Sequence, residues 1–132
     1  MNAIYDAPTD PQGNPLYNHL PRTTPVYLKS TEQSWFRYAC DGIHVAIAVE
    51  DPFGAFGRQT ILDYLENCYR GEASLNTKDQ KGGAGKGLFR IIESSELVVF
   101  NVKPKVRTEV IAIFNVKPSK QDKSPSFHYF YA

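Results

Sequence analysis

The feature of this sequence best suited to chemistry is the glycine cluster KGGAGKG at residues 81–87. Glycine leaves backbone N–H groups accessible and permits positive φ angles. The next residues, Leu88–Ser95, have helical apolar spacing, and the first N–H groups of a helix lie unpaired at the positive end of its dipole. Such a loop can hold phosphate. When the glycine cluster is considered by itself, a flexible linker ahead of a helix explains it as well as a phosphate-binding loop does.

Two familiar phosphate-binding motifs do not fit this cluster. A P-loop with Gly85-Lys86 as its glycine–lysine pair needs glycine at position 80, which is Gln80. It also needs a hydroxyl residue at position 87, which is Gly87. A dinucleotide-binding fingerprint needs a strand directly upstream, whereas Glu72–Gln80 is polar and lacks periodicity. Any phosphate site here therefore belongs to another class.

The surrounding sequence predicts the elements that would position this loop. Helices are predicted at Arg58–Arg70 and Leu88–Ser95 from their apolar spacing. Hairpins are predicted where Asp41-Gly42 and residues 103–107 separate apolar segments. The predicted strands are Val26–Lys29, Ser34–Cys40, Ile43–Val49, Leu97–Val102 and Thr108–Val116. The aromatic segment Phe127–Tyr131 either packs back on this body or forms an exposed patch for a partner.

Length and composition restrict the class of protein. The 132 residues suit one domain, and a hydrophobic fraction of 42% supports a core. The net charge of +1 gives no general reason to bind nucleic acid or an anionic membrane. Apolar runs are too short for a membrane span, and no signal-like segment opens the sequence. Two cysteines, expected to be reduced, complete the expectation of a cytoplasmic protein.

The order of these features resembles the GHKL nucleotide-binding fold of gyrase, Hsp90, histidine kinases, MutL and the anti-sigma serine kinases. A strand runs into Asp51 and Gly54, a polar stretch follows, and the glycine loop opens a helix before a closing hairpin. The resemblance implies an α+β fold. It would be a two-layer sandwich with a mostly antiparallel or mixed sheet of about five strands and two or three helices on one face. The domain would span residues 1–116 and lack its first helix, with residues 117–132 as a polar and aromatic tail.

The resemblance also implies ATP and Mg²⁺ as ligands, and it is closest to the anti-sigma serine kinase branch. Asp51 would accept a hydrogen bond from the adenine amino group, with Thr108 nearby, and Gly54 would let the backbone turn under the base. Asn2 would contact the magnesium ion. The phosphates would be held by the glycine loop and the helix behind it, through Gly83, Gly85, Lys86 and Gly87.

Three departures from the family pattern bear on catalysis. Phe53 and Ala55 stand where the family prefers glycine, and the family's glutamate, four residues before Asn2, would precede the first residue given. Either the chain is a fragment of a longer protein or the domain lacks this acid, and without the acid nucleotide binding can persist while turnover falls greatly. We therefore expect an ATP-binding regulatory domain with a protein partner, such as an anti-anti-sigma-like factor. Relatives often form homodimers. The alternative is a pseudo-enzyme that retains the fold for protein interaction alone.

Overall fold

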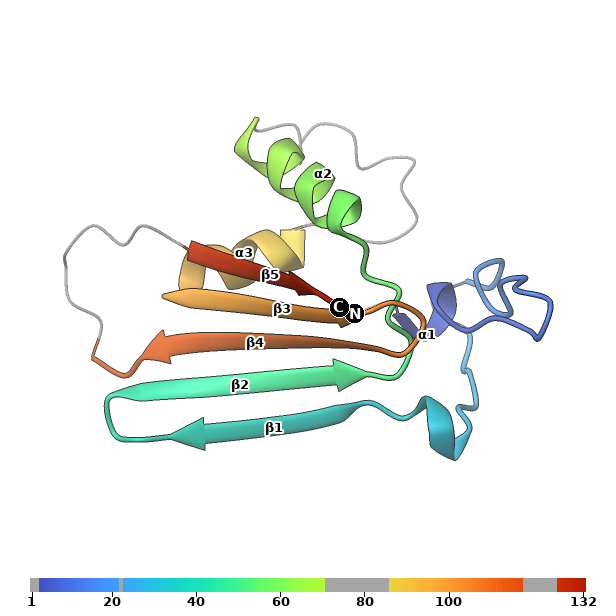
Figure 1. Cartoon of the computed structure of the whole chain (residues 1–132), viewed down its shortest axis with the longest axis horizontal. Coiled ribbons are helices and arrows are strands. Elements are labelled where there is room, and N and C mark those ends of the chain that lie inside the picture. Colours follow the sequence, from blue (N-terminus) through green and yellow to red (C-terminus); the bar gives the residue numbers. More distant parts are fainter. Residues whose placement is uncertain (1–2, 22, 71–85, 118–125) are drawn as a thin grey trace.

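The computed structural model describes residues 3–21, 23–70, 86–117 and 126–132. Five strands form one mixed sheet in the order β1-β2-β4-β3-β5, in which β3 and β5 are parallel and the other neighbours antiparallel (Figure 1). The fold is therefore α+β. The elements in chain order are α1 (Ala3–Asp6), the 3₁₀ helix η1 (Ser30–Glu32), β1 (Trp35–Cys40), β2 (His44–Asp51), α2 (Arg58–Tyr69), α3 (Lys86–Ser94), β3 (Leu97–Lys103), β4 (Arg107–Asn115) and β5 (Ser126–Tyr131).

The hairpin predicted at Asp41-Gly42 joins β1 to β2. Gly42 has a φ of 89°, and the Asp41 carboxylate accepts hydrogen bonds from the N–H groups of Ile43 (2.8 Å) and His44 (2.6 Å). These two bonds stabilise the ionised form, so they lower the pKa of Asp41 to about 2. The local sequence thus encodes the turn through a glycine and a side-chain acceptor.

The two faces of the sheet differ in what they carry. Val98, Phe100 and Val102 on β3 and Thr108 and Ala112 on β4 are buried and point to one side, which we call the helix-side face. The intervening residues point to the other side, the open face. Side chains of α2 and α3 pack on the helix-side face and complete a core of Ile61, Leu65, Ile92, Val98, Phe100 and Ala112.

The helices cover only part of the sheet. Figure 1 shows α2 and α3 gathered beside β3 and β5, while β1 and β2 form the distant edge. All six residues of β1 are exposed, in contrast to the alternating burial of β3. The core therefore lies over one half of the sheet. In the described part of the chain, no helix is both long and apolar enough to cross a bilayer.

Two segments differ from the strands expected from sequence. Val26–Lys29 is not a strand; it is a segment without regular secondary structure that leads into η1. Its four residues supply too little apolar alternation to add an edge to the sheet. The aromatic segment 127–131, for which two interpretations were open, packs back on the body as strand β5. The fifth strand of the sheet is therefore β5.

Candidate functional site

Asp51 is the last residue of β2, at the position where the sequence places an adenine anchor. Its side chain is 5% exposed, and its carboxylate accepts a hydrogen bond from the N–H of Phe53 at 3.0 Å. Pro52 cannot donate to the ladder and ends the strand at this point. Burial raises the pKa of the Asp51 carboxyl, while hydrogen bonds from the backbone of Phe53 and Gly54 oppose that increase. A partly desolvated acid therefore sits at one end of the sheet.

Thr108 lies directly opposite Asp51 in the β2–β4 ladder and is 2% exposed. The Thr108 hydroxyl acts to lower the pKa of Asp51, but the contact does not reach hydrogen-bond geometry. Its Oγ1 atom is thus buried without a hydrogen-bond partner among the residues that the structure describes. Buried hydroxyls are nearly always paired, and the Asp51 carboxyl is the buried polar group directly across the ladder from Thr108.

Gly54 packs against the turn between β3 and β4. Its φ is 59°, and a side chain there would collide with the carbonyl oxygen of Lys103 and lie 2.7 Å from Lys105 N and 2.8 Å from Val106 N. The Gly54 carbonyl also accepts a weak hydrogen bond of 3.4 Å from Lys105 N. This close approach requires glycine on packing grounds. The role expected of Gly54 beneath an adenine ring stays a prediction.

The remaining site residues expected from sequence belong to the glycine loop and the start of the chain. Lys86 and Gly87 form the first turn of α3, where the space around the Gly87 α-carbon is open. In Figure 1, α3 begins toward the end of the sheet at which β2 ends and runs back from it. Gly83, Gly85 and Asn2 lie outside the described residues. The structure thus brings Asp51, Gly54 and Thr108 together and leaves the phosphate contacts as predictions.

Tyr129 on β5 is a polar residue of the aromatic segment, and it is not among the residues expected to bind ATP. It packs against the core beside Phe100, and its hydroxyl is buried without a hydrogen-bond partner among the described residues. Burial raises the pKa of Tyr129, Tyr131 adds to this effect, and the charge of Arg58 on α2 opposes it. The alternation of aromatic residues at 127, 129 and 131 was the available signal, because it is typical of a strand with one buried face.

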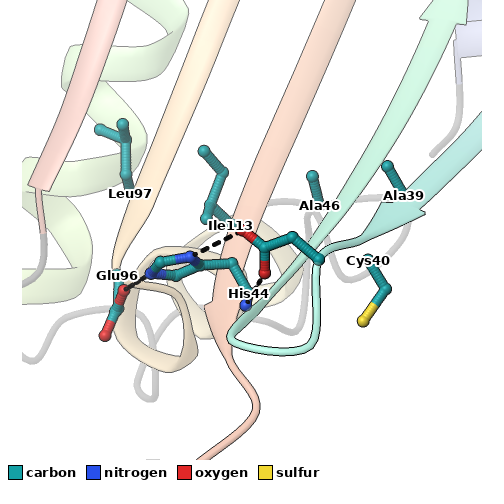
Figure 2. A pocket seen from close by; sticks show the side chains of 8 residues that line it. Ala39, Cys40, His44, Ala46, Glu96, Leu97 and Ile113 are labelled. Carbon is teal, nitrogen blue, oxygen red and sulfur yellow. Dashed lines mark hydrogen bonds and ion pairs between the residues drawn. The ribbon is translucent and has the colours of Figure 1, made fainter.

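A second feature is a shallow hollow of about 530 Å³ on the open face, at the opposite end of β2 from Asp51 (Figure 2). Its walls are mostly apolar side chains, and His44 lies between two acids at one side of it. The His44 ring nitrogens are 3.5 Å from Asp41 Oδ2 and 3.8 Å from Glu96 Oε2. Among the described residues, no group of His, Cys, Asp and Glu is arranged to hold a metal ion. The hollow therefore lies apart from the Asp51 site.

Comparison of this chain with known protein families, with curated proteins and with solved structures finds no significant match. The candidate site therefore depends on its own geometry and on the motif order in the sequence.

A direct consequence of the buried carboxyl is a pH-dependent effect on stability. We expect Asp51→Asn to raise the thermal midpoint of unfolding at pH 7, because the folded state disfavours the ionised carboxyl. A carboxyl whose pKa is higher in the folded than in the unfolded protein stabilises the fold fully below the unfolded-state pKa of about 3.9. This stabilisation is lost as the pH rises through the folded-state pKa. The difference between the two proteins should therefore shrink toward acid pH in thermal melts.

Asp41→Asn provides the control of opposite sign. The pKa of Asp41 is lowered to about 2 in the folded protein. Its carboxylate therefore stabilises the fold above the unfolded-state pKa, and this stabilisation is lost as the pH falls through about 2. Its replacement should slightly lower the midpoint at pH 7. A lower midpoint at pH 7 for Asp51→Asn would mean that the Asp51 carboxylate stabilises the fold, contrary to the burial argument.

Proposed function

We propose that this protein is an ATP-binding regulatory domain of the GHKL type that acts in signalling through a protein partner. The observation that supports it most is the pairing of two buried polar groups, the Asp51 carboxyl and the unpartnered Thr108 hydroxyl, across neighbouring strands. Neither group belongs to the apolar core, and hydrogen bonds from backbone N–H groups leave part of the Asp51 carboxylate available to a ligand.

The chemistry of this pair suits adenine. A carboxylate accepts a hydrogen bond from the exocyclic amino group, and the neighbouring hydroxyl can donate to a ring nitrogen. Guanine carries a carbonyl oxygen where adenine carries the amino group, so it would place an acceptor against the Asp51 carboxylate. Sites built from buried hydrogen-bonding groups reject ligands that leave those groups unpaired. We therefore propose specificity for adenine over guanine.

The start of α3 is the proposed phosphate site. Its first N–H groups and its dipole favour an anion, and the glycines at 83, 85 and 87 would allow phosphate oxygens to approach the backbone. Lys86 would add positive charge, and Asn2 would contact the magnesium ion that bridges the phosphates. In this proposal the protein acts by binding the nucleotide, and no turnover is proposed.

The alternative is a pseudo-enzyme that uses the fold only for protein interaction. The observation that favours it is the exposure of large aromatic side chains on β1, where Trp35, Phe36 and Tyr38 are each more than half exposed. Nucleotide binding is the measurement that separates the two functions.

The test is thermal unfolding of the full chain with Mg²⁺ and either ATP or GTP, followed by calorimetric titration. ATP at about 100 times its Kd should stabilise the protein by about 2.7 kcal/mol, and GTP should give a much smaller shift. Asp51→Asn should weaken ATP binding by about 1–3 kcal/mol, which is roughly 5- to 150-fold in Kd. Because the same variant is expected to be more stable without ligand, a loss of affinity cannot be attributed to unfolding.

Thr108→Val is the matched variant, since valine has nearly the shape of threonine and lacks the hydroxyl. It should retain the fold and bind ATP less tightly than the wild type. The absence of any shift with millimolar ATP, or equal shifts with ATP and GTP, would overturn the proposal and favour the pseudo-enzyme.

A further inference from the structure

The outer edge of β1 is an unprotected strand edge. None of the other described strands pairs with it, and its six residues, WFRYAC, are exposed on both faces. Tyr38 at its centre is 78% exposed. Exposed edges offer unpaired N–H and C=O groups to another chain, so proteins normally protect them with proline, lysine, bulges or a covering segment.

β1 lacks these protective features. It has no proline or lysine, and it pairs with β2 in continuous register from Trp35 to Cys40 without a bulge. Its one charged residue, Arg37, is directed over the sheet to Glu50 (2.9 Å) and Glu109 (2.6 Å). The guanidinium is thus held on the open face by two carboxylates and does not guard the edge.

The register of the hairpin shows which peptide groups point outward. Asp41 N donates to His44 O at 3.2 Å, so this residue pair is a hydrogen-bonded one. Hydrogen-bonded and non-hydrogen-bonded pairs alternate along an antiparallel ladder. The peptide groups of Ala39 and Arg37 therefore point to β2. The N–H and C=O groups of Phe36, Tyr38 and Cys40 point away from the sheet.

We propose that β1 is a homodimerisation strand, pairing antiparallel with β1 of a second copy about a two-fold axis at Tyr38. In this register Tyr38 faces Tyr38 of the second copy, and Phe36 faces Cys40 of the second copy. All three outward-pointing residues then fall in hydrogen-bonded pairs, each of which exchanges both N–H···O bonds. The two five-stranded sheets become one continuous sheet.

Side chains on both faces agree with this axis. On the helix-side face, Phe36 and Tyr38 of the two copies form one aromatic band, where cross-strand aromatic pairs are favourable. On the open face, Arg37 lies opposite Ala39 of the second copy, and its diagonal neighbours are that copy's Asp41 and Arg37. Glu50 and Glu109 of its own sheet neutralise each Arg37. An axis at Arg37 is unfavourable, because it opposes two arginines and aligns peptide groups already used by β2.

Self-complementarity is the reason to assign a second copy rather than an unrelated peptide to this edge. The only cation of β1, Arg37, is already neutralised by Glu50 and Glu109 of its own sheet, so the strand can pair with itself without an uncompensated like-charge contact. This inference does not depend on nucleotide binding, since β1 contains none of the proposed ATP-binding residues.

Disulfide trapping tests the register directly. In a Cys40→Ser, Cys68→Ser background, Tyr38→Cys would place two thiols in a hydrogen-bonded pair with a Cα separation of about 5.5 Å, within the range for a disulfide. We expect rapid formation of a covalent dimer on mild oxidation. Ala39→Cys in the same background is the matched control. Its thiol would face Arg37 of the second copy. The thiol at position 39 of the second copy would lie two residues further along the strand, out of reach for a disulfide.

Oligomeric state gives the second readout, by light scattering at low and high micromolar protein without nucleotide. The wild type should be a dimer, and Tyr38→Lys should be a folded monomer because two lysines would oppose each other on the axis. Tyr27→Lys, at an exposed aromatic outside β1, should remain a dimer. A monomeric wild type, a dimer that survives Tyr38→Lys, or equal trapping at positions 38 and 39 would overturn the inference.

Discussion

Phe100→Ala is expected to lower the free energy of unfolding by about 3–5 kcal/mol. Phe100 is 0% exposed at the centre of the core, and its ring lies 5.7 Å from that of Phe56 and 6.2 Å from that of Phe127. Alanine would remove these ring contacts and leave a cavity between the sheet and α2 and α3. Since small domains are stable by about 5–15 kcal/mol, much of the total would be lost. Urea unfolding followed by circular dichroism measures the change.

Phe130→Ala is the matched control for this change. Phe130 lies on the neighbouring strand β5 but on the open face, where it is 55% exposed. Its replacement should cost less than about 1 kcal/mol, because a half-exposed ring loses little burial. Equal costs at positions 100 and 130 would show that the packing core does not lie where the helices meet β3.

Gly54→Ala is expected to cost about 2–5 kcal/mol. About 1–2 kcal/mol comes from placing a side chain at a φ of 59°, and about 1–3 kcal/mol from displacing packed backbone. The added Cβ would collide with the carbonyl oxygen of Lys103, and backbone cannot rotate away as a flexible side chain can. The thermal midpoint and the urea midpoint should both fall.

Gly42→Ala separates the two causes. Gly42 also has a positive φ, of 89°, but nothing lies within 4 Å of the position that its Cβ would occupy. Its substitution should therefore cost only the backbone contribution of about 1–2 kcal/mol. If alanine is tolerated equally at both positions, the loop after β2 does not pack on the β3–β4 turn as tightly as described.

Local signals accounted for most of the elements. The Asp41-Gly42 turn predicted the β1–β2 hairpin, and the apolar spacing of residues 58–70 predicted α2. The α+β class with a five-stranded mixed sheet is confirmed. The strand expected at Val26–Lys29 was wrong because β-propensity over four residues says nothing about whether a neighbouring edge is available. Strand β5 escaped assignment because its parallel partner, β3, is distant in sequence.

The candidate site was predictable only in part. Asp51 and Thr108 were both named from the sequence, and the β2–β4 register places them opposite each other. The tight packing of Gly54 on Lys103 was not predictable, because it depends on how a loop and a distant turn meet in space. The same holds for the burial of the Tyr129 hydroxyl. Roles of the glycine loop stay predictions.

The strand order also has a consequence for how quickly this chain can reach its native state. The β1–β2 and β3–β4 hairpins each close over a few residues, and such units form in about 1–10 μs. The central pairing joins residues 44–51 to residues 108–115, across a loop of about sixty residues that includes both α2 and α3. Non-local pairings of this kind slow folding. We therefore expect the diffusive search that brings the two hairpins together to limit the folding rate.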